Sequence, residues 1–240
     1  MDKLKRIIME SDNIVFFGGA GVSTESQIPD FRSADGLYSE KDKKSYPPEV
    51  MLSYSFFISH PEEFYEFYKS KMIYKDAKPN PAHIALAKLE EQGKLKSVIT
   101  QNIDGLHQAA GSKNVLELHG SVHRNYCMEC GKNYDLDYVL NSQSVIPKCE
   151  KCGGMVRPDV VLYEESLDTD VLYKSIDYIS QADVLIVGGT SLVVYPAAGL
   201  VDYYRGDKLV LINKTATPYD RKANIVIHDS IGKVLSSVVL

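Results

Sequence analysis

The sequence lacks three features that would each point to a particular class of protein. It has no excess of basic residues, because 27 lysines and arginines stand against 32 aspartates and glutamates, for a net charge of −5. Proteins that bind nucleic acids or anionic membranes usually have the opposite balance. No apolar run approaches the ~18 residues of a membrane span. The apolar stretch within the N-terminal residues MDKLKRIIMESDN is also too short for a signal peptide. We therefore expect a cytoplasmic protein that binds neither nucleic acid nor membrane, and nothing implies an oligomer.

Cysteine is scarce, and its spacing is informative. The four cysteines form two pairs, Cys127-x2-Cys130 and Cys149-x2-Cys152. Two disulfides or a redox motif are alternatives, but disulfides are unusual in a chain without a secretion signal. Each pair offers two sulfurs to the same point, so the spacing favours one tetrahedral zinc ion. Because the protein would supply all four ligands, this zinc should stabilise the fold and do no chemistry.

The remaining composition is that of a globular chain. With 240 residues, 44% hydrophobic and 25% charged, the chain fits one large domain with inserts. Short apolar runs rich in β-branched residues lie at 14–17, 97–100, 184–187, 209–212 and 225–227. Helical patterns lie at 4–8, 80–93, 167–179 and 197–204. Runs that are apolar on both faces are typical of buried parallel strands, and their alternation with helices predicts an α/β fold, a Rossmann-like doubly wound sheet.

Two stretches interrupt the alternation. Residues 33–75 contain a polar loop followed by aromatic-rich helical sequence, and residues 123–156 contain the cysteines. We expect residues 1–32, 76–122 and 157–240 to form the Rossmann-like domain. The cofactor loop and helical insert (33–75) and the zinc-binding insert (123–156) would form a smaller lobe, with a cleft between the lobes.

A glycine-rich run, Gly18-Gly19-Ala20-Gly21-Val22-Ser23-Thr24, follows the first predicted strand. Such glycines let the backbone approach a pyrophosphate, whose charge is met by amide groups and a helix N-terminus. The dinucleotide fingerprint is incomplete, however, because Thr24 stands where its third glycine belongs. The run alone is therefore equally consistent with a tight turn between a strand and a helix.

Other polar segments lie beside the glycine run or directly after predicted strands. Gln27–Arg32 places a carboxylate, an aromatic ring and a guanidinium beside the glycine run, and Gln101–His107 follows the second apolar run. His119-Gly120, Gly189-Thr190-Ser191 and Asn213 also follow predicted strands. Because the carboxyl ends of parallel strands meet at one edge of a sheet, these segments predict a cofactor crevice there.

Taken in order, these motifs resemble the sirtuin family of NAD-dependent protein-lysine deacylases, particularly its compact bacterial members. The resemblance covers nearly the whole chain and rests on Gly19–Ser23, Ile28–Arg32, Gln101–Asp104, His119-Gly120, the cysteine pairs and Gly189–Ser191. It implies NAD as co-substrate, one structural zinc, and acyl-lysine proteins or peptides as partners. The implied reaction removes mainly acetyl groups from lysine, giving nicotinamide, acyl-ADP-ribose and the free lysine.

The resemblance also implies roles for individual residues. His119 would be the general base that acts on a ribose hydroxyl, and Asn102 would hold ribose hydroxyls and an ordered water. The implied NAD contacts are Gly19, Ala20, Gly21, Thr24, Phe31, Arg32, Gln101, Ile103, Asp104, His119, Gly189, Thr190, Ser191, Asn213 and Ile231. The substrate peptide would add as a strand between Val160-Val161-Leu162 and Val193-Val194-Tyr195, although both segments could simply be core strand ends.

Three other functions are alternatives. ADP-ribosyl transfer to protein would use the same crevice. A zinc-ribbon nucleic-acid-binding protein is disfavoured by the net charge of −5. A dehydrogenase is disfavoured by the incomplete fingerprint.

The chain departs from the family pattern at several positions. Gly18 stands where threonine is usual, Gln27 where glycine is usual, and Tyr163-Glu164-Glu165 replaces Phe-Gly-Glu. None of these removes a catalytic group, but we expect altered loop flexibility and substrate-mouth charge. Members that favour succinyl groups resemble one another in a Tyr-x-x-Arg pair, and the matching stretch here has Tyr68 and Lys71. Lysine lacks the two-pronged carboxylate geometry of arginine, so acetyl should be preferred. Alternatively, the two residues are one turn of an amphipathic helix.

Overall fold

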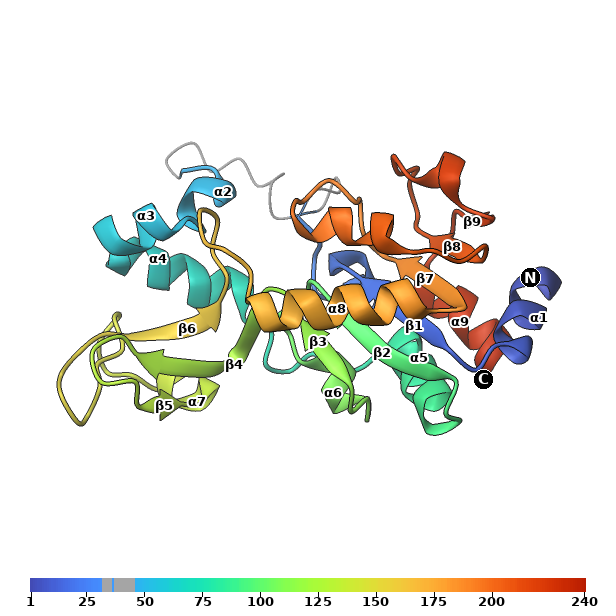
Figure 1. Ribbon diagram of the computed structural model, residues 1–240. Coiled ribbons are helices and arrows are strands. Elements are labelled where there is room, and N and C mark those ends of the chain that lie inside the picture. The colour runs from blue at the N-terminus through green and yellow to red at the C-terminus, as the bar shows by residue number, and fades with distance from the viewer. Residues whose placement is uncertain (32–35, 37–45) are drawn as a thin grey trace.

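The computed structural model describes residues 1–31, 36 and 46–240. Its main sheet has six parallel strands in the order β3-β2-β1-β7-β8-β9 (Figure 1). They are β1 (Ile14–Gly18), β2 (Leu95–Thr100), β3 (Val115–Glu117), β7 (Val184–Gly188), β8 (Leu209–Ile212) and β9 (Ile225–Ile227). All five apolar runs are strands of this sheet. The predicted Rossmann-like α/β architecture is confirmed.

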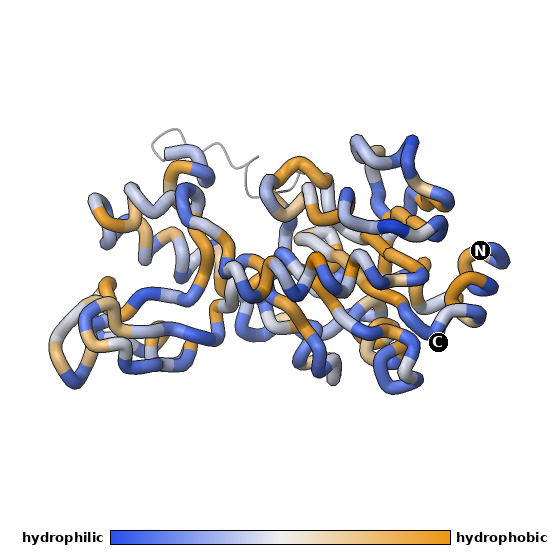
Figure 2. The backbone as a smooth tube through the Cα atoms, viewed as in Figure 1, coloured by the Kyte–Doolittle hydropathy of each residue, from blue (hydrophilic) through white to orange (hydrophobic). Residues whose placement is uncertain are grey.

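Both faces of the sheet are covered, which explains why its strands are apolar along their whole length. Ile14 and Phe16 pack against a face covered by α1 (Asp2–Glu10), α5 (Pro81–Glu91) and α9 (Ile231–Val239). Val15 and Phe17 point to the opposite face, under α8 (Thr169–Gln181) and η5 (Ala197–Tyr203). Figure 2 shows hydrophobic stretches along these inner strands and hydrophilic residues along the outer turns. The helix expected at 197–204 is a 3-10 helix, η5.

A second, antiparallel sheet has the order β5-β4-β6 and lies beside the main sheet, at the left of Figure 1. Its strands are β4 (Gly120–Cys127), β5 (Asn133–Tyr134) and β6 (Val156–Val160). With it pack α2 (Pro48–Met51), α3 (Tyr54–Ser59), α4 (Pro61–Phe67), the π-helical turn η4 (Tyr68–Met72) and α7 (Leu136–Leu140). Aromatic side chains of the helices, including Phe57 and Phe64, share one core with Val122 and Val156 of the sheet. We call this group of elements the small lobe.

The chain after β1 forms two short 3-10 helices, η1 (Ala20–Val22) and η2 (Thr24–Ser26), in and just after the glycine-rich run. The loop packs tightly against the end of β7, since the Gly21 amide donates to the Gly189 carbonyl oxygen at 2.8 Å. A Cβ on Gly19 would lie 2.9 Å from the Cβ of Thr190. Glycine is therefore required where the two loops meet.

Short α6 (Leu106–Ala109) follows the loop after β2. In the part of the chain that the structure describes, no helix combines the length and the apolar character needed to cross a bilayer.

Candidate active site

A cavity of about 1020 Å³ lies between the carboxyl edge of the main sheet and the small lobe. Residues from both lobes line it. Among the predicted cofactor contacts and catalytic residues, those that line it are Gly19, Ala20, Gly21, Thr24, Phe31, Gln101, Asn102, Ile103, Asp104, His119, Gly189, Thr190, Ser191, Asn213 and Ile231. Arg32 lies outside the described residues. The fold thus brings segments up to about two hundred residues apart in sequence into one site, as the carboxyl ends of parallel strands do.

The two predicted peptide segments also reach this cavity. Val160, Val161, Leu162, Val194 and Tyr195 line it. Val193 does not line the cavity, and 48% of its surface is exposed. The amide of Val161 donates to the carbonyl oxygen of His119 at 3.0 Å, so the first segment is tied to the residue predicted to be the base.

His119 follows β3, and its ring orientation is fixed by one hydrogen bond. Its Nδ1 lies 2.9 Å from the carbonyl oxygen of Gln101. A carbonyl oxygen can only accept, so Nδ1 carries the proton and Nε2 of the neutral ring keeps a free lone pair. Burial lowers the pKa of His119, although the bond to Gln101 opposes that effect. The ring is therefore neutral near pH 7 and able to accept a proton at Nε2.

A buried hydrogen-bond relay joins the glycine-rich loop to the loop after β2. The hydroxyl of Ser23 donates to Asp104 Oδ2 at 2.6 Å, and Asn102 Nδ2 donates to the same hydroxyl oxygen at 3.0 Å. The other oxygen, Asp104 Oδ1, accepts from the Leu106 amide at 2.9 Å. Burial raises the pKa of Asp104, and the hydrogen bonds from Ser23 and Leu106 oppose that rise. The relay fixes both Asn102 and Asp104 at the cavity wall.

Ser23 is a site residue to which the sequence assigned no role. It lines the cavity and is almost completely buried, yet its hydroxyl makes both contacts of the relay. Its place inside the glycine-rich run was the only available signal. The partners are 81 and 79 residues away along the chain, so their contact could not be read from local spacing.

Two further contacts connect the strand ends. Gln101 Nε2 donates to Thr190 Oγ1 at 3.1 Å, and the Gln101 amide donates to the Gly18 carbonyl oxygen at 3.0 Å. At the far end of the cavity, Asn213 Nδ2 donates to the Thr215 carbonyl oxygen at 2.8 Å. The first two bonds join the ends of β1, β2 and β7, and the third fixes the side chain of Asn213 just after β8.

The four cysteines converge in the small lobe, as their spacing predicts. Their sulfur atoms all lie within 4.8 Å of one another, and none forms a disulfide. The Sγ–Sγ distances are 3.5 Å for Cys127 and Cys152 and 3.6 Å for Cys130 and Cys149. Tetrahedral zinc with Zn–S bonds of ~2.3 Å places its sulfurs ~3.8 Å apart. The cluster is therefore positioned to bind one metal ion of this kind.

Tyr68 and Lys71 lie in η4, and their environments differ. Tyr68 is fully buried and stacks on Phe64, and its hydroxyl has no hydrogen-bond partner among the described residues. Lys71 lines the cavity, as do its neighbours Met72 and Ile73. The structure thus places only the lysine of the pair at the cavity wall.

Comparison with known proteins agrees with this geometry. A model of the Sir2 family matches residues 19–196. The chain belongs to the Sir2 family. A Clostridium acetobutylicum protein named NAD-dependent protein deacetylase is 68% identical to it over 239 residues, which cover 100% of this chain and 98% of that protein.

Two Sir2 structures extend the likeness to the whole fold. One contains a Sir2 histidine-to-alanine variant with a deacetylated p53 peptide and 3′-O-acetyl ADP-ribose, and matches with a TM-score of 0.91 at 42% identity. The other, Sir2 with a p53 peptide and NAD+, matches with a TM-score of 0.86 at 42% identity. Each match covers 99% of this chain and 96% of the other. The small lobe and the cavity thus lie within the matched Sir2 fold.

Proposed function

We propose that this protein removes acyl groups, mainly acetyl, from protein lysines and consumes one NAD and one water molecule in doing so. The products would be nicotinamide, acyl-ADP-ribose and the free lysine. One observation carries the proposal: His119, with Nε2 available as a base, shares a cavity with the Ser23–Asn102–Asp104 relay. The Sir2 structures solved with p53 peptides and NAD+ or an acetylated ADP-ribose support it.

His119 acts as the general base. Its Nδ1–H bond to the Gln101 carbonyl oxygen holds the ring in one tautomer, so Nε2 can take the proton of a ribose hydroxyl. Such proton removal typically contributes ~10²–10⁴ in rate, and it requires the neutral form of the ring. The lowered pKa of His119 keeps that form populated at neutral pH.

NAD would supply both the leaving group, nicotinamide, and the ribose carbon to which the acyl oxygen becomes bonded. Asp104 binds the carboxamide of that leaving group, and Ile103 shapes the pocket around it. Phe31 covers the nicotinamide ribose, and Gln101 and Asn102 hold its hydroxyls and an ordered water. Gly19, Ala20, Gly21, Thr24 and Arg32 bind the diphosphate, whereas Gly189, Thr190, Ser191, Asn213 and Ile231 bind the adenosine end.

The acyl-lysine peptide binds between Val160-Val161-Leu162 and Val193-Val194-Tyr195. Backbone hydrogen bonds of an added strand would provide most of the affinity, so many peptide sequences would be accepted. Five of these six residues line the cavity, which supports the assignment.

Cys127, Cys130, Cys149 and Cys152 hold one structural zinc. The Tyr134 hydroxyl donates to Cys149 Sγ at 3.1 Å, a contact that orients one ligand. A thiolate site of this kind needs reduced cysteines, which is consistent with a location in the cytoplasm.

The domain division expected from the sequence is kept in this proposal. Residues 1–32, 76–122 and 157–240 form the NAD-binding domain, with inserts at 33–75 and 123–156. The separate apolar cores of the main sheet and the small lobe support it, and β4 and β6 cross the boundary between them.

The test is mass spectrometry of an acetyl-lysine peptide incubated with the protein, with and without NAD. The proposal expects loss of the acetyl mass only with NAD, together with equal amounts of nicotinamide and acetyl-ADP-ribose. NAD labelled in its adenine separates the competing reaction. Label that remains covalently bound to protein, without deacetylation, would favour ADP-ribosyl transfer instead.

A further inference from the structure

Glu164 has a backbone conformation that is unusual for its residue type. Its φ angle is +77°, in the left-handed region where a side chain is strained and glycine is favoured. It lies in the segment 160–165, which follows β6 and lines the cavity. Such strain persists where surrounding contacts compensate for it.

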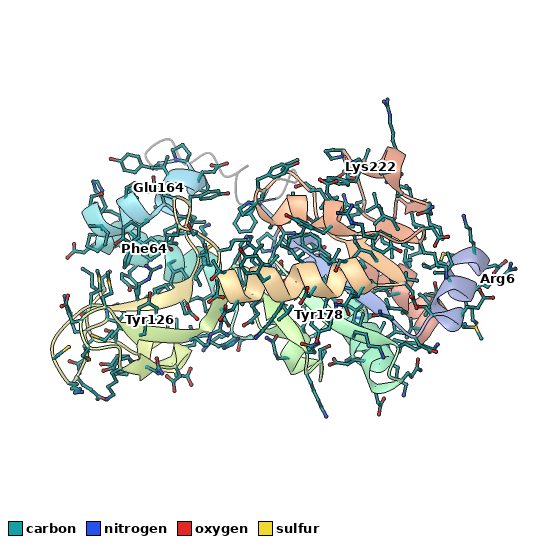
Figure 3. The ribbon with its side chains drawn as sticks, in the orientation of Figure 1. Arg6, Phe64, Tyr126, Glu164, Tyr178 and Lys222 are labelled. Carbon is teal, nitrogen blue, oxygen red and sulfur yellow. The ribbon has the colours of Figure 1, made fainter. Side chains whose placement is uncertain are left out.

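The compensating contacts come from the helical insert. The carboxylate of Glu164 accepts two hydrogen bonds from Ser55 of α3, one from its amide at 2.9 Å and one from its hydroxyl at 2.9 Å. Backbone bonds continue the contact, because the Tyr54 amide donates to the Tyr163 carbonyl oxygen and the Tyr163 amide donates to the Leu52 carbonyl oxygen, each at 3.0 Å. Figure 3 labels Glu164 where its loop meets the α2–α3 region.

The neighbouring residue fixes the same segment to its own sheet. Glu165 pairs with Arg157 through two hydrogen bonds of 2.8 and 3.0 Å, and Glu165 also accepts from the Leu162 amide at 2.9 Å. Besides the backbone bonds of Val161 and Tyr163, two carboxylates hold the segment. Glu165 joins it to β6, whereas Glu164 joins it to α3 of the helical insert.

We propose that Glu164 is a positioning residue that holds segment 160–165 on α3 before the substrate peptide binds. The inference rests on the proposed function, because Val160-Val161-Leu162 is one of the two proposed peptide-binding strands. A strand that is already ordered loses less conformational freedom when a peptide pairs with it, so binding is tighter. Glu164 would therefore set the affinity for the peptide and leave the chemistry at His119 unchanged.

Ser55→Ala tests this contact, although the Ser55 hydroxyl also lies 3.3 Å from the hydroxyl of Ser53, the residue before α3. It removes one donor to Glu164 while keeping the charge of the carboxylate, and Ser55 does not line the cavity. We expect a rise of about threefold in peptide KM, which is near the low end of what one intramolecular hydrogen bond contributes. Glu164→Ala should raise it by about tenfold. The kcat at saturating peptide and the KM for NAD should not change in either variant.

Two further variants separate positioning from general stability. Ser55→Ala combined with Glu164→Ala should raise the peptide KM no further than Glu164→Ala alone, because both remove the same contact. Glu164→Gly removes the carboxylate and also the left-handed strain, so it should raise the KM without lowering the melting temperature. Ser59→Ala is the matched control, since its hydroxyl lies on the same helix and donates to the Ser55 carbonyl oxygen within α3.

Amide hydrogen exchange of segment 160–165 provides a readout that does not depend on activity. Exchange at Leu162 and Tyr163 should be faster in Ser55→Ala and Glu164→Ala than in the wild type or Ser59→Ala. Unchanged exchange overturns the proposal, and so does faster exchange with an unchanged peptide KM. A KM that rises only in step with a falling melting temperature also overturns it. If the wild-type protein has no deacylase activity, the proposed function is wrong, and the inference fails with it. The exchange data would still show whether the contact with Ser55 orders the segment.

Discussion

Lowering the pH from 7.5 to 5 should cost this protein about 4 kcal/mol of folding stability through two buried histidines. His83 of α5 and His107 of α6 have exposed fractions of 0% and 1%, and their ring centroids are 4.7 Å apart. Burial lowers the pKa of His83 from 6.5 to about 4. Burial, together with the charge of His83, lowers the pKa of His107 from 6.5 to about 3.

The direction of the effect follows from proton binding in the two states. In the unfolded chain both histidines bind a proton below about pH 6.5, whereas in the folded protein both stay neutral down to about pH 4. Acid therefore favours the unfolded state, by about 1.4 kcal/mol per pH unit for each histidine. At pH 5 this amounts to about 2 kcal/mol for each histidine, or about 4 kcal/mol in total. That is a large share of the free energy of unfolding of a typical protein, about 5–15 kcal/mol.

Urea unfolding at pH 7.5 and pH 5 measures the loss. The comparison is with the double variant His83→Gln, His107→Leu, in which glutamine keeps an acceptor for the Asn80 amide that now donates to His83 Nδ1. The double variant should lose about 4 kcal/mol less than the wild type between the two pH values. His228→Gln, at an exposed position beside Asp220, is the comparison for a histidine outside the core. Equal losses in wild type and double variant would show that His83 and His107 do not cause the loss of stability.

Three further predictions concern the metal cluster and the cavity. Chelation or Cys130→Ser should lower the melting temperature and activity together, since structural zinc contributes folding free energy; a metal-free protein with full stability would contradict this. Ser23→Ala should leave Asn102 and Asp104 less well oriented and lower kcat/KM about tenfold with little change in melting temperature; wild-type kinetics would exclude the relay. Wild type should prefer acetyl- over succinyl-lysine on one peptide, and Lys71→Arg should raise succinyl activity by offering a two-pronged contact; a wild-type preference for succinyl would overturn that expectation.

The strands of the main sheet were predictable because burial on both faces leaves a pattern in the local sequence. Burial on both faces leaves a continuous apolar run, and residues 14–17 and 184–187 show such runs plainly. The cysteine cluster was predictable for a similar reason, since two-residue gaps within each pair place the sulfurs close together. The polar strand ends were predictable once parallel strands were expected, because their carboxyl ends share an edge.

Other features depend on contacts that local patterns do not contain. Gln27 and Glu164 both adopt the left-handed backbone conformation, with φ angles of 65° and 77°. The sequence showed only that they stand where the family usually has glycine. Whether such a residue is tolerated depends on partners such as Ser55, 109 residues away. The close packing of the loop after β1 against Gly189 and Thr190 likewise joins residues far apart in the sequence. Val193 was expected to contact peptide with its neighbours, yet it does not line the cavity.

The His119→Ala variant tests whether His119 is the general base. Turnover of an acetyl-lysine peptide and binding of NAD are measured on the same folded preparation. We expect turnover to fall by ~10²–10⁴, with the melting temperature and NAD binding retained. Turnover near the wild-type value in a correctly folded variant would contradict it.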